Sequence, residues 1–184
     1  MKKIFTLIAL AASGLVCAQT NDTIHKNTIS LNGMYSEPGQ IGLSYEYYKY
    51  NSRSTNKAFI ANLSYGVMNY DADIVDVDGT GFVIELGGRK YFNTSQKGLY
   101  SANYLSYGNI KFDKDTPFGN FDGTYSYFSF FAPEIGYKIK LGGISIDPYI
   151  GGMWKIEVKG KGDVDNNNTD EWVLRGGLRV GYSF

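Results

Sequence analysis

The chain has 184 residues, which corresponds to a single domain. Its 18 lysines and arginines balance 18 aspartates and glutamates, so no bulk charge attracts it to nucleic acid. Tyrosine (16) and glycine (23) are abundant while proline (4) is scarce, a composition that favours β-strands joined by tight turns over helices.

The first eighteen residues have the three parts of a secretory signal peptide. Lys2-Lys3 is the basic part, Ile4 to Ala12 the apolar part and Val16-Cys17-Ala18 the small-residue cleavage site. The apolar run is shorter than the roughly 20 residues that a membrane-spanning helix needs. The alternative to a signal peptide is an N-terminal anchor or a buried helix. We predict a signal peptide over 1–18 and a mature domain over 19–184, with a formal charge of (18 − 2) − 18 = −2.

Cys17 is the sole cysteine and lies inside that segment. Bacterial lipoproteins acylate such a cysteine, but their lipobox has a small residue before it, where this chain has Val16. The mature protein is therefore expected to lack disulfides and thiol sites, which suits a chain that crosses an oxidising periplasm unfolded.

After a polar lead-in that holds the only histidine, His25, eight segments alternate between apolar and polar residues, although Leu99 to Asp113 alternates less clearly and its faces are not assigned. Turn residues such as Glu37-Pro38-Gly39-Gln40 and Gly142-Gly143 separate them. Pro133 and Pro148 fall within segments, where we expect bulges or strand ends. The predicted strands are Thr28 to Ser36, Ile41 to Tyr50, Lys57 to Tyr70, Thr80 to Phe92, Leu99 to Asp113, Tyr125 to Leu141, Ile144 to Lys161 and Glu171 to Phe184.

The connections alternate in length. Those after the third, fifth and seventh strands are predicted to be long polar loops, over Asp71 to Gly79, Lys114 to Thr124 and Asp163 to Asp170. Long outer loops and short periplasmic turns are typical of an even-stranded outer-membrane barrel with both termini inside. The first outer turn, Glu37 to Gln40, is short and departs from this pattern.

Alternation alone fits either a membrane barrel or a soluble one, because both have one apolar and one polar face. Three features favour the membrane. Polar faces rich in Gly, Ser and Asn, with charges of both signs, fit a narrow lumen. The last strand alternates cleanly, with Trp172, Leu174, Gly176, Leu178, Val180, Tyr182 and Phe184 on its apolar face. Aromatic residues near the predicted strand ends fit the two girdles at the membrane interfaces: Tyr35, Tyr70, Tyr91, Phe92, Tyr100, Tyr125, Tyr127, Trp172, Tyr182 and Phe184.

The chain end Leu178-x-Val180-x-Tyr182-x-Phe184 resembles the carboxy-terminal signal read by the outer-membrane barrel assembly machinery. The mature length resembles the small eight-stranded outer-membrane barrels, such as outer membrane protein X and the membrane domain of outer membrane protein A. This resemblance implies an all-β, closed, antiparallel up-and-down transmembrane barrel of about eight strands. It rests on pattern and length, and it transfers no functional residue.

An eight-stranded ring leaves an interior just wide enough for side chains. We predict that its inward-facing charges form a salt-bridge and hydrogen-bond network that fills the lumen, because a charge sealed inside is tolerable only when paired. The alternative is a gated polar path for ions. The residues are Glu46, Glu85, Arg89, Glu134, Lys138, Lys155, Glu157, Arg175 and Arg179.

No catalytic, cofactor or metal site is predicted. The lone His25 lies away from the outer loops, and nothing places two carboxylates in an open cleft. The acidic stretch Asp71 to Gly79 superficially resembles a calcium loop, but its first ligand position would be Ile74. We interpret it as a solvated loop.

The sequence therefore predicts a monomeric outer-membrane barrel with a structural or surface-interaction role, exported through the periplasm of a Gram-negative cell. Its expected partners are membrane lipid and lipopolysaccharide, and the assembly machinery during biogenesis, but not nucleic acid. Loops on a rigid scaffold are the candidate contact surface. Two alternatives remain: a narrow ion or solute channel, and a secreted soluble barrel that binds an apolar ligand as lipocalins do.

Overall fold

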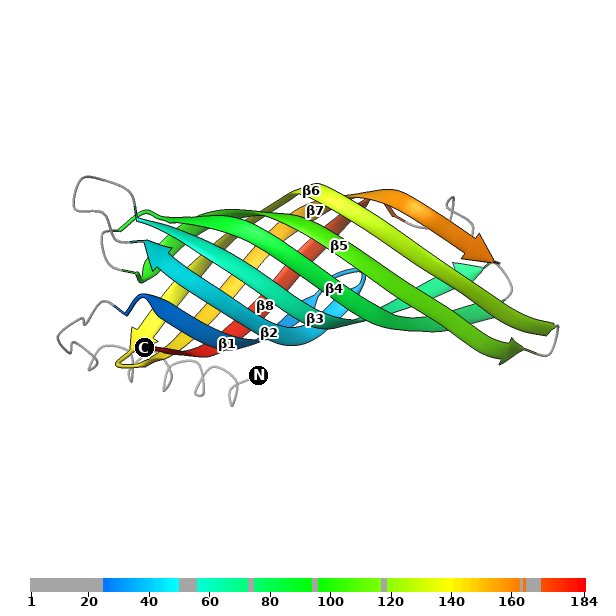
Figure 1. The fold of residues 1–184 in the computed structure, drawn as a ribbon, viewed down its shortest axis with the longest axis horizontal. Coiled ribbons are helices and arrows are strands. Elements are labelled where there is room, and N and C mark those ends of the chain that lie inside the picture. The colour runs from blue at the N-terminus through cyan, green and yellow to red at the C-terminus, as the bar shows by residue number, and fades with distance from the viewer. Residues whose placement is uncertain are drawn as a thin grey trace, which may run out of the picture.

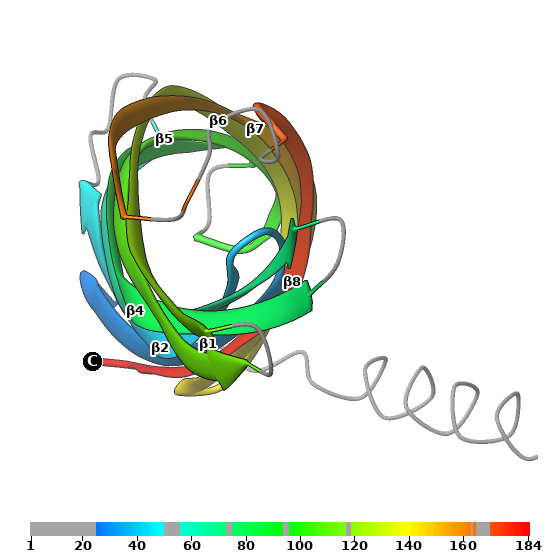
Figure 2. The ribbon, with the colours of Figure 1, turned by 90° about the vertical axis from the view of Figure 1, so that its right-hand side faces the viewer.

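The computed structural model describes residues 25–49, 56–72, 75–93, 96–116, 119–162, 164 and 170–184. These residues form one closed barrel of eight antiparallel strands in up-and-down order (Figures 1 and 2), as predicted. Among them no helix is long and apolar enough to cross a membrane. The predicted signal peptide lies outside the described residues. The strands are β1 (Asn27–Tyr35), β2 (Gly39–Lys49), β3 (Lys57–Ala72), β4 (Val75–Tyr91), β5 (Gly98–Thr116), β6 (Gly119–Leu141), β7 (Ile144–Gly162) and β8 (Trp172–Ser183).

The barrel closes where the first strand pairs with the last. Ile29 is opposite Tyr182 and Leu31 is opposite Val180 in this ladder. The seam continues past β8, because the amide of Asn27 donates to the carbonyl of Phe184 at 3.1 Å and the amide of Phe184 donates back at 2.9 Å. Both termini of the barrel therefore lie at one end, called here the terminal end; the opposite end is the distal end (Figure 1).

A band of apolar side chains faces outward around the middle of the barrel. On β3 it runs from Phe59 through Leu63 to Val67, bounded by the exposed polar residues Lys57 and Asn69. This stretch of nine residues matches the roughly 9–11 residues of a tilted strand that crosses a bilayer. In water such a band would leave a large apolar surface exposed, so its physical solvent is hydrocarbon.

Beyond the band, the two faces of the sheet exchange character. Towards the distal end Tyr70, Val77 and Phe112 are buried inside, while Asp78 and Lys111 on the same hairpins are exposed. The period of two persists, but outward polar residues now meet water and inward apolar residues form a small core. Figure 1 shows strands β3 to β6 continuing well past the β1–β2 hairpin.

Two of the predicted long loops are wrong, because the strands continue through them with their faces exchanged. Asp71 to Gly79 and Lys114 to Thr124 are not long loops, because the strands on either side pair up to Ala72 opposite Val75 and Thr116 opposite Gly119. Their outward residues are polar, as loop residues usually are, so the sequence pattern did not indicate that the strands continue. The third predicted loop, Asp163 to Asp170, lies largely outside the described residues.

The β6–β7 ladder contains two irregularities. Its register shifts between Ser126 and Tyr127 and again between Phe128 and Phe131. Tyr127 was predicted to lie in an interfacial girdle, but it is fully buried in the lumen while Phe130 and Phe131 both face outward. Bulges let two successive residues share a face, which breaks a strict alternation.

The outward-facing Asn103 of β5 satisfies the backbone at the second irregularity. Its side-chain amide donates to the carbonyl of Phe130 at 3.2 Å, and its oxygen accepts from the amide of Ala132 at 3.0 Å. A polar side chain can therefore face the apolar band, because its hydrogen bonds are used locally. The nearby Pro133 fits the expected bulge. Pro148 does not: β7 continues through it, and only its pair with β6 is missing.

Candidate functional site

Arg89 is the centre of a cluster of charges inside the terminal half of the barrel. Its Nη1 lies 2.7 Å from Glu46 Oε2 and 2.9 Å from Asp147 Oδ2, while its Nη2 lies 3.8 Å from Glu134 Oε1. These residues come from β4, β2, β7 and β6, so the cluster exists only once the sheet has closed. The guanidinium also lies 3.8 Å from the ring centroid of Tyr100, close enough for a cation–π interaction.

Arg179 on β8 forms the second ion pair of the cluster. Its Nη1 and Nη2 donate to the two oxygens of Glu134 at 2.8 and 2.9 Å, the two-pronged geometry that makes such pairs strong. The hydroxyls of Tyr100 and Tyr104 donate to the same carboxylate at 3.1 and 3.2 Å. The guanidinium lies 3.8 Å from the centroid of Tyr149, on the next strand. The pair is thus enclosed by aromatic rings rather than by solvent.

Lys138 closes the cluster towards the terminal end. Its Nζ lies 3.0 Å from Glu46 Oε1 and 3.3 Å from Thr28 Oγ1. Tyr91 donates to Glu46 at 2.9 Å, and Thr28 shares a 2.9 Å hydrogen bond with Ser183 across the seam. The lysine therefore links the ion pairs to the strands that close the barrel.

A further ion pair lies on the distal side of the cluster. Arg175 Nη1 is 3.0 Å from Glu85 Oε1, and both side chains are fully buried. Asn62 donates to Glu85 Oε2 at 2.8 Å. Arg175 also lies 3.9 Å from the sulfur of Met153, where the charged half of the lumen meets the apolar half.

The cluster is electrically balanced. Its four carboxylates (Glu46, Glu85, Glu134, Asp147) face four cations (Arg89, Lys138, Arg175, Arg179), and all eight side chains are at most 5% exposed. A neutral, hydrogen-bonded set is the arrangement in which buried charges are tolerated. We call these eight residues the charged cluster.

The structure places eight of the nine predicted interior charges in the lumen as buried residues, and the ninth, Glu157, is half-buried. Seven of them belong to the charged cluster, whereas Lys155 and Glu157 lie farther towards the distal end on β7. Asp147 was missing from the predicted set although it lies on the inward face of β7. Charge balance could have found it: four carboxylates and five cations were predicted, and Asp147 makes five of each.

The interior tyrosines are a second feature that the sequence did not reveal. Tyr70, Tyr91, Tyr100, Tyr125 and Tyr127 were predicted to lie in the interfacial girdles, but all five are buried in the lumen. The remaining girdle residues are exposed: Tyr35, Phe92, Trp172, Tyr182 and Phe184. Tyrosine serves both purposes, because its ring packs in an apolar site while its hydroxyl bonds to an ion pair.

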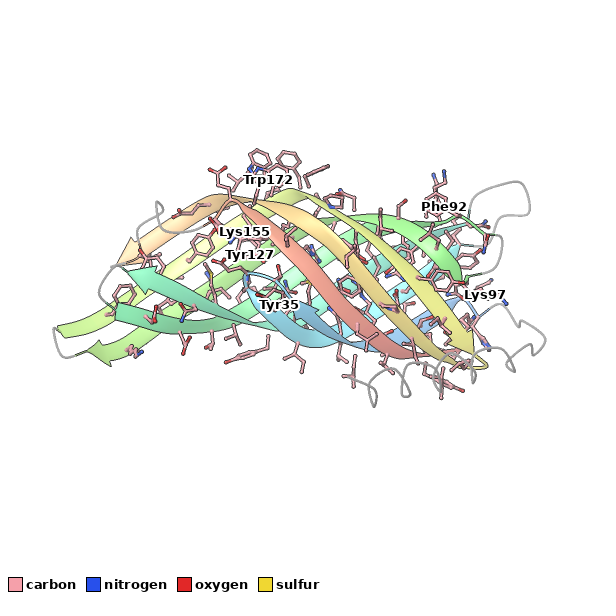
Figure 3. All side chains as sticks on the ribbon, turned by 180° about the vertical axis from the view of Figure 1, so that it is seen from behind. Tyr35, Phe92, Lys97, Tyr127, Lys155 and Trp172 are labelled. Atoms are coloured by element: carbon pink, nitrogen blue, oxygen red, sulfur yellow. The ribbon has the colours of Figure 1, made fainter. Side chains whose placement is uncertain are left out.

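One side of the barrel carries a larger outward aromatic group. Phe130 lies 5.4 Å from Trp154 and Phe131 lies 6.2 Å from Trp172, and the two indoles stack at 6.3 Å. These rings come from β6, β7 and β8, and Figure 3 labels Trp172 among the side chains outside the barrel. Amphipathic rings of this kind are enriched where hydrocarbon meets headgroups.

The residues of the predicted assembly signal face outward. The exposed fractions are 45% for Leu178, 46% for Val180, 61% for Tyr182 and 52% for Phe184. Arg179, between the first two, is 2% exposed and points into the lumen. The terminal strand thus has apolar residues on the outside and charges on the inside.

The charged cluster has few of the features that chemistry requires. Its carboxylates are already bonded to cations and tyrosine hydroxyls, and they face a packed interior rather than a cleft. Within the described residues, no group of three or more His, Cys, Asp or Glu side chains is arranged to hold a metal ion. The charged cluster thus occupies the interior of the terminal half of the barrel.

Solved structures share this architecture. A major outer membrane protein of Thermus thermophilus is similar over 87% of this chain and 100% of its own, with a TM-score of 0.59 and 12% identity. The chain has the fold of an outer-membrane barrel. The N-terminal β-barrel domain of Pseudomonas aeruginosa OprF (TM-score 0.47, 16% identity) covers 87% of this chain, and Acinetobacter baumannii CarO (0.43, 12%) covers 90%; both match along their full length. No protein-family model and no curated protein matches the sequence.

Proposed function

We propose that this protein is an integral, monomeric outer-membrane barrel that does not conduct ions and does not catalyse a reaction. The observation that carries the proposal is the charged cluster, which has no net charge and spans the terminal half of the lumen. Water or an ion would have to displace ion pairs such as Arg89–Glu46 and Arg179–Glu134 in order to pass. Breaking buried pairs of this kind is costly, about 3–5 kcal/mol for each one that loses a partner.

The outer surface supports the membrane location. The apolar band on β3 suits hydrocarbon, and the stacked, outward-facing pair Trp154–Trp172 suits the interface with the headgroups. With the termini on the periplasmic side, the distal hairpins project outward from the cell. Lipid and lipopolysaccharide are then the partners of the band and its rim.

The distal hairpins are the proposed contact surface. Their outward faces carry exposed charges of both signs, including Asp76, Asp78, Lys111, Asp113 and Lys114. Lys114 Nζ donates to the carbonyl of Asp76 at 2.7 Å, so the two hairpins are tied together. Paired strands present these charges in a fixed pattern, as a structural or surface-interaction role requires.

Planar-bilayer conductance tests the closed lumen. The purified, folded chain is reconstituted beside a large-pore porin as the positive control, and we expect no steady current from this protein. A stable, reproducible current would overturn the closed lumen and favour the channel alternative. Fractionation tests the location: recovery in the periplasmic soluble fraction without detergent would favour the lipocalin-like alternative.

A further inference from the structure

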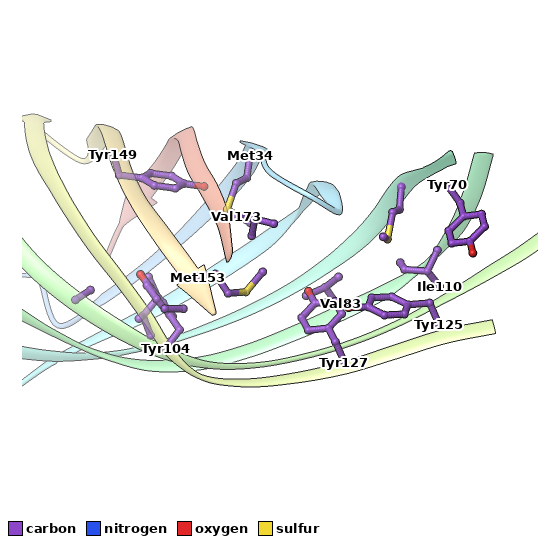
Figure 4. Packing of buried hydrophobic residues seen from close by; sticks show 14 of the residues in the cluster. Met34, Tyr70, Val83, Tyr104, Ile110, Tyr125, Tyr127, Tyr149, Met153 and Val173 are labelled. Atoms are coloured by element: carbon purple, nitrogen blue, oxygen red, sulfur yellow. The ribbon is translucent and has the colours of Figure 1, made fainter. Parts of the chain in front are cut away.

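Side chains fill the interior of the barrel along its length. The charged cluster occupies the terminal half, and apolar residues such as Ile110, Tyr127 and Met153 pack in the distal half (Figure 4). The outward face is therefore the surface on which this barrel can hold a ligand. On three neighbouring strands of that face, β2, β3 and β4, the series of outward apolar residues ends at a lysine.

These three lysines lie side by side at the terminal edge of the apolar band. Lys49 on β2 is opposite Lys57 on β3, and Lys57 is opposite Lys90 on β4. All three side chains are exposed. Directly opposed residues of antiparallel strands have Cβ atoms about 4.5–5.5 Å apart, and like charges placed there repel. We call these residues the lysine row. The row lowers the stability of the sheet unless an anion lies between its ammonium groups.

The chain itself does not supply that anion. The sequence contains no Asp or Glu from Tyr47 to Asn69 or from Leu86 to Phe112, and these stretches include both turns next to the lysine row. Glu46 and Glu85 just precede them, but both face the lumen and belong to the charged cluster. None of the three lysines forms an ion pair with another residue that the structure describes. The counter-charge therefore has to come from another molecule.

A shallow recess of about 430 Å³ adjoins the lysine row on the outer wall. Lys57, Lys90 and Ser101 line its terminal side, and Gly88 forms its floor. Gly88 is opposite Phe59 on β3, and a Cβ added to the glycine would meet no atom within 4 Å. The recess exists because the outward side chains of the band are interrupted at this glycine.

The position of the lysine row matches the level of lipid phosphates. Lys57 bounds the apolar band on β3, and Phe59 is the next outward residue inside the band. An ammonium group is a compact donor for a phosphate, and the hydroxyl of Ser101, opposite Lys90, is a further donor. A choline or ethanolamine headgroup would bring its own cation to the row, whereas a glycerol headgroup would not. The charges therefore favour an anionic lipid.

We propose that the lysine row binds the phosphate of an anionic phospholipid, such as phosphatidylglycerol, while one of its acyl chains lies in the recess over Gly88. In the orientation proposed above the terminal end faces the periplasm, so the lipid belongs to the periplasmic leaflet. The inference rests on that membrane location and deepens it, because it names one lipid class and its place on the barrel. Elsewhere the band contacts lipids without such a preference.

Quenching by brominated lipids tests the site. In a Trp154→Phe, Trp172→Phe background, Phe59→Trp places a reporter beside the recess, and Tyr137→Trp, similarly exposed on β6, is the matched control away from the lysine row. The folded variants are reconstituted in mixed vesicles of phosphatidylcholine and phosphatidylglycerol, with bromine on the acyl chains of one lipid or the other. We expect phosphatidylglycerol to be preferred at least about fivefold at Phe59→Trp, the effect of one lysine near an anionic lipid surface. We expect no preference at Tyr137→Trp.

A charge-matched pair of variants tests the headgroup contact. Lys57→Gln with Lys90→Gln should abolish the preference at Phe59→Trp, because the phosphate loses two ammonium groups. Lys111→Gln with Lys161→Gln removes the same charge from exposed positions at the distal end and should leave the preference unchanged.

A second matched pair tests the acyl chain. Gly88→Leu fills the recess without meeting a neighbour and should reduce the preference, because the chain is displaced. Gly33→Leu is the control, since Gly33 is an outward glycine on β1 whose added Cβ also meets nothing within 4 Å. It should retain the full preference.

The outcomes separate this site from the membrane location. Equal preference at both reporters, or a preference that survives Lys57→Gln with Lys90→Gln, would overturn the site. Quenching at Phe59→Trp that is weaker than at Tyr137→Trp for every lipid would overturn it too, because a second copy of the chain would then cover the recess. Insertion into vesicles without any preference would overturn the site alone, whereas failure to insert would overturn the membrane location with it.

Labelling in cells tests the leaflet. Lys49→Cys should react with a maleimide carried on a large polyethylene glycol only after the outer membrane has been permeabilised, and the parent chain treated in the same way is the control. Reaction on intact cells would place the lysine row in the outer leaflet, and would overturn the phospholipid in favour of lipopolysaccharide phosphates.

Discussion

Removing one negative charge from the charged cluster should destabilise the barrel strongly. In Glu134→Gln the shape of the side chain is kept, but the cluster changes from four carboxylates and four cations to a net charge of +1. Glu134 lies 2.8 Å from Arg179 and 3.8 Å from Arg89, so two buried guanidinium groups lose an anionic partner. Two unit charges 4 Å apart interact by about 4 kcal/mol at an effective dielectric constant near 20. Mutations that break buried pairs cost about 3–5 kcal/mol, and we expect that loss in the free energy of unfolding.

Urea unfolding in lipid vesicles, followed by the fluorescence of Trp154 and Trp172, measures this loss. The control Asp113→Asn makes the same carboxylate-to-amide change at an exposed site and should stay within about 0.5 kcal/mol of the parent. The double variant Glu134→Gln with Arg179→Gln restores neutrality and should recover about 1–3 kcal/mol relative to Glu134→Gln. A loss below 0.5 kcal/mol in Glu134→Gln would refute the reasoning, because it would mean that water already screens the lumen.

Three further predictions concern the outer surface and the seam. Leu63→Lys places a charge in the apolar band and should lower the free energy of unfolding in vesicles by about 2–4 kcal/mol, whereas Asn69→Lys outside the band should change it little; equal effects would contradict the band. Asn103→Leu adds an apolar side chain to the lipid face yet should destabilise by about 1–3 kcal/mol in urea unfolding, because it leaves the carbonyl of Phe130 and the amide of Ala132 without partners; a stabilised variant would refute this role. Phe184→Ala keeps the backbone bonds to Asn27, so its stability in vitro should be nearly unchanged while its yield in the outer membrane of cells falls; an unchanged yield would remove Phe184 from the assembly signal.

Alternation with a period of two was enough to predict the eight strands and the inward direction of most of the charges. It succeeds because successive strand side chains point to opposite faces wherever the backbone is regular. Glu46 and Lys138 illustrate the limit: each was placed inside, but their 3.0 Å ion pair joins residues 92 positions apart. Only the closure and stagger of the barrel determine which inward residues meet.

Two other features could not be predicted from the sequence: the point at which a strand passes from hydrocarbon into water, and the position of bulges. On β3 the outward face holds Val67 and then Asn69, while the inward face holds Ser64 and then Met68. The period of two is unchanged. Outward residues are apolar where the strand faces hydrocarbon and polar where it faces water, so the same period has opposite faces on the two sides of that boundary. Tyr127 was misassigned because Phe130 and Phe131 both face outward at the irregularity between Phe128 and Phe131, so the alternation before that point is opposite to the alternation after it.

The central claim is that apolar side chains of the band face lipid while the charges face one another inside. Spin labels at Leu31→Cys and Leu63→Cys, 67% and 59% exposed in the parent, test it in lipid vesicles. We predict that both spin labels collide frequently with dissolved oxygen, which concentrates in hydrocarbon, and rarely with a water-soluble nickel chelate. Free access of the chelate to both labels would contradict the account.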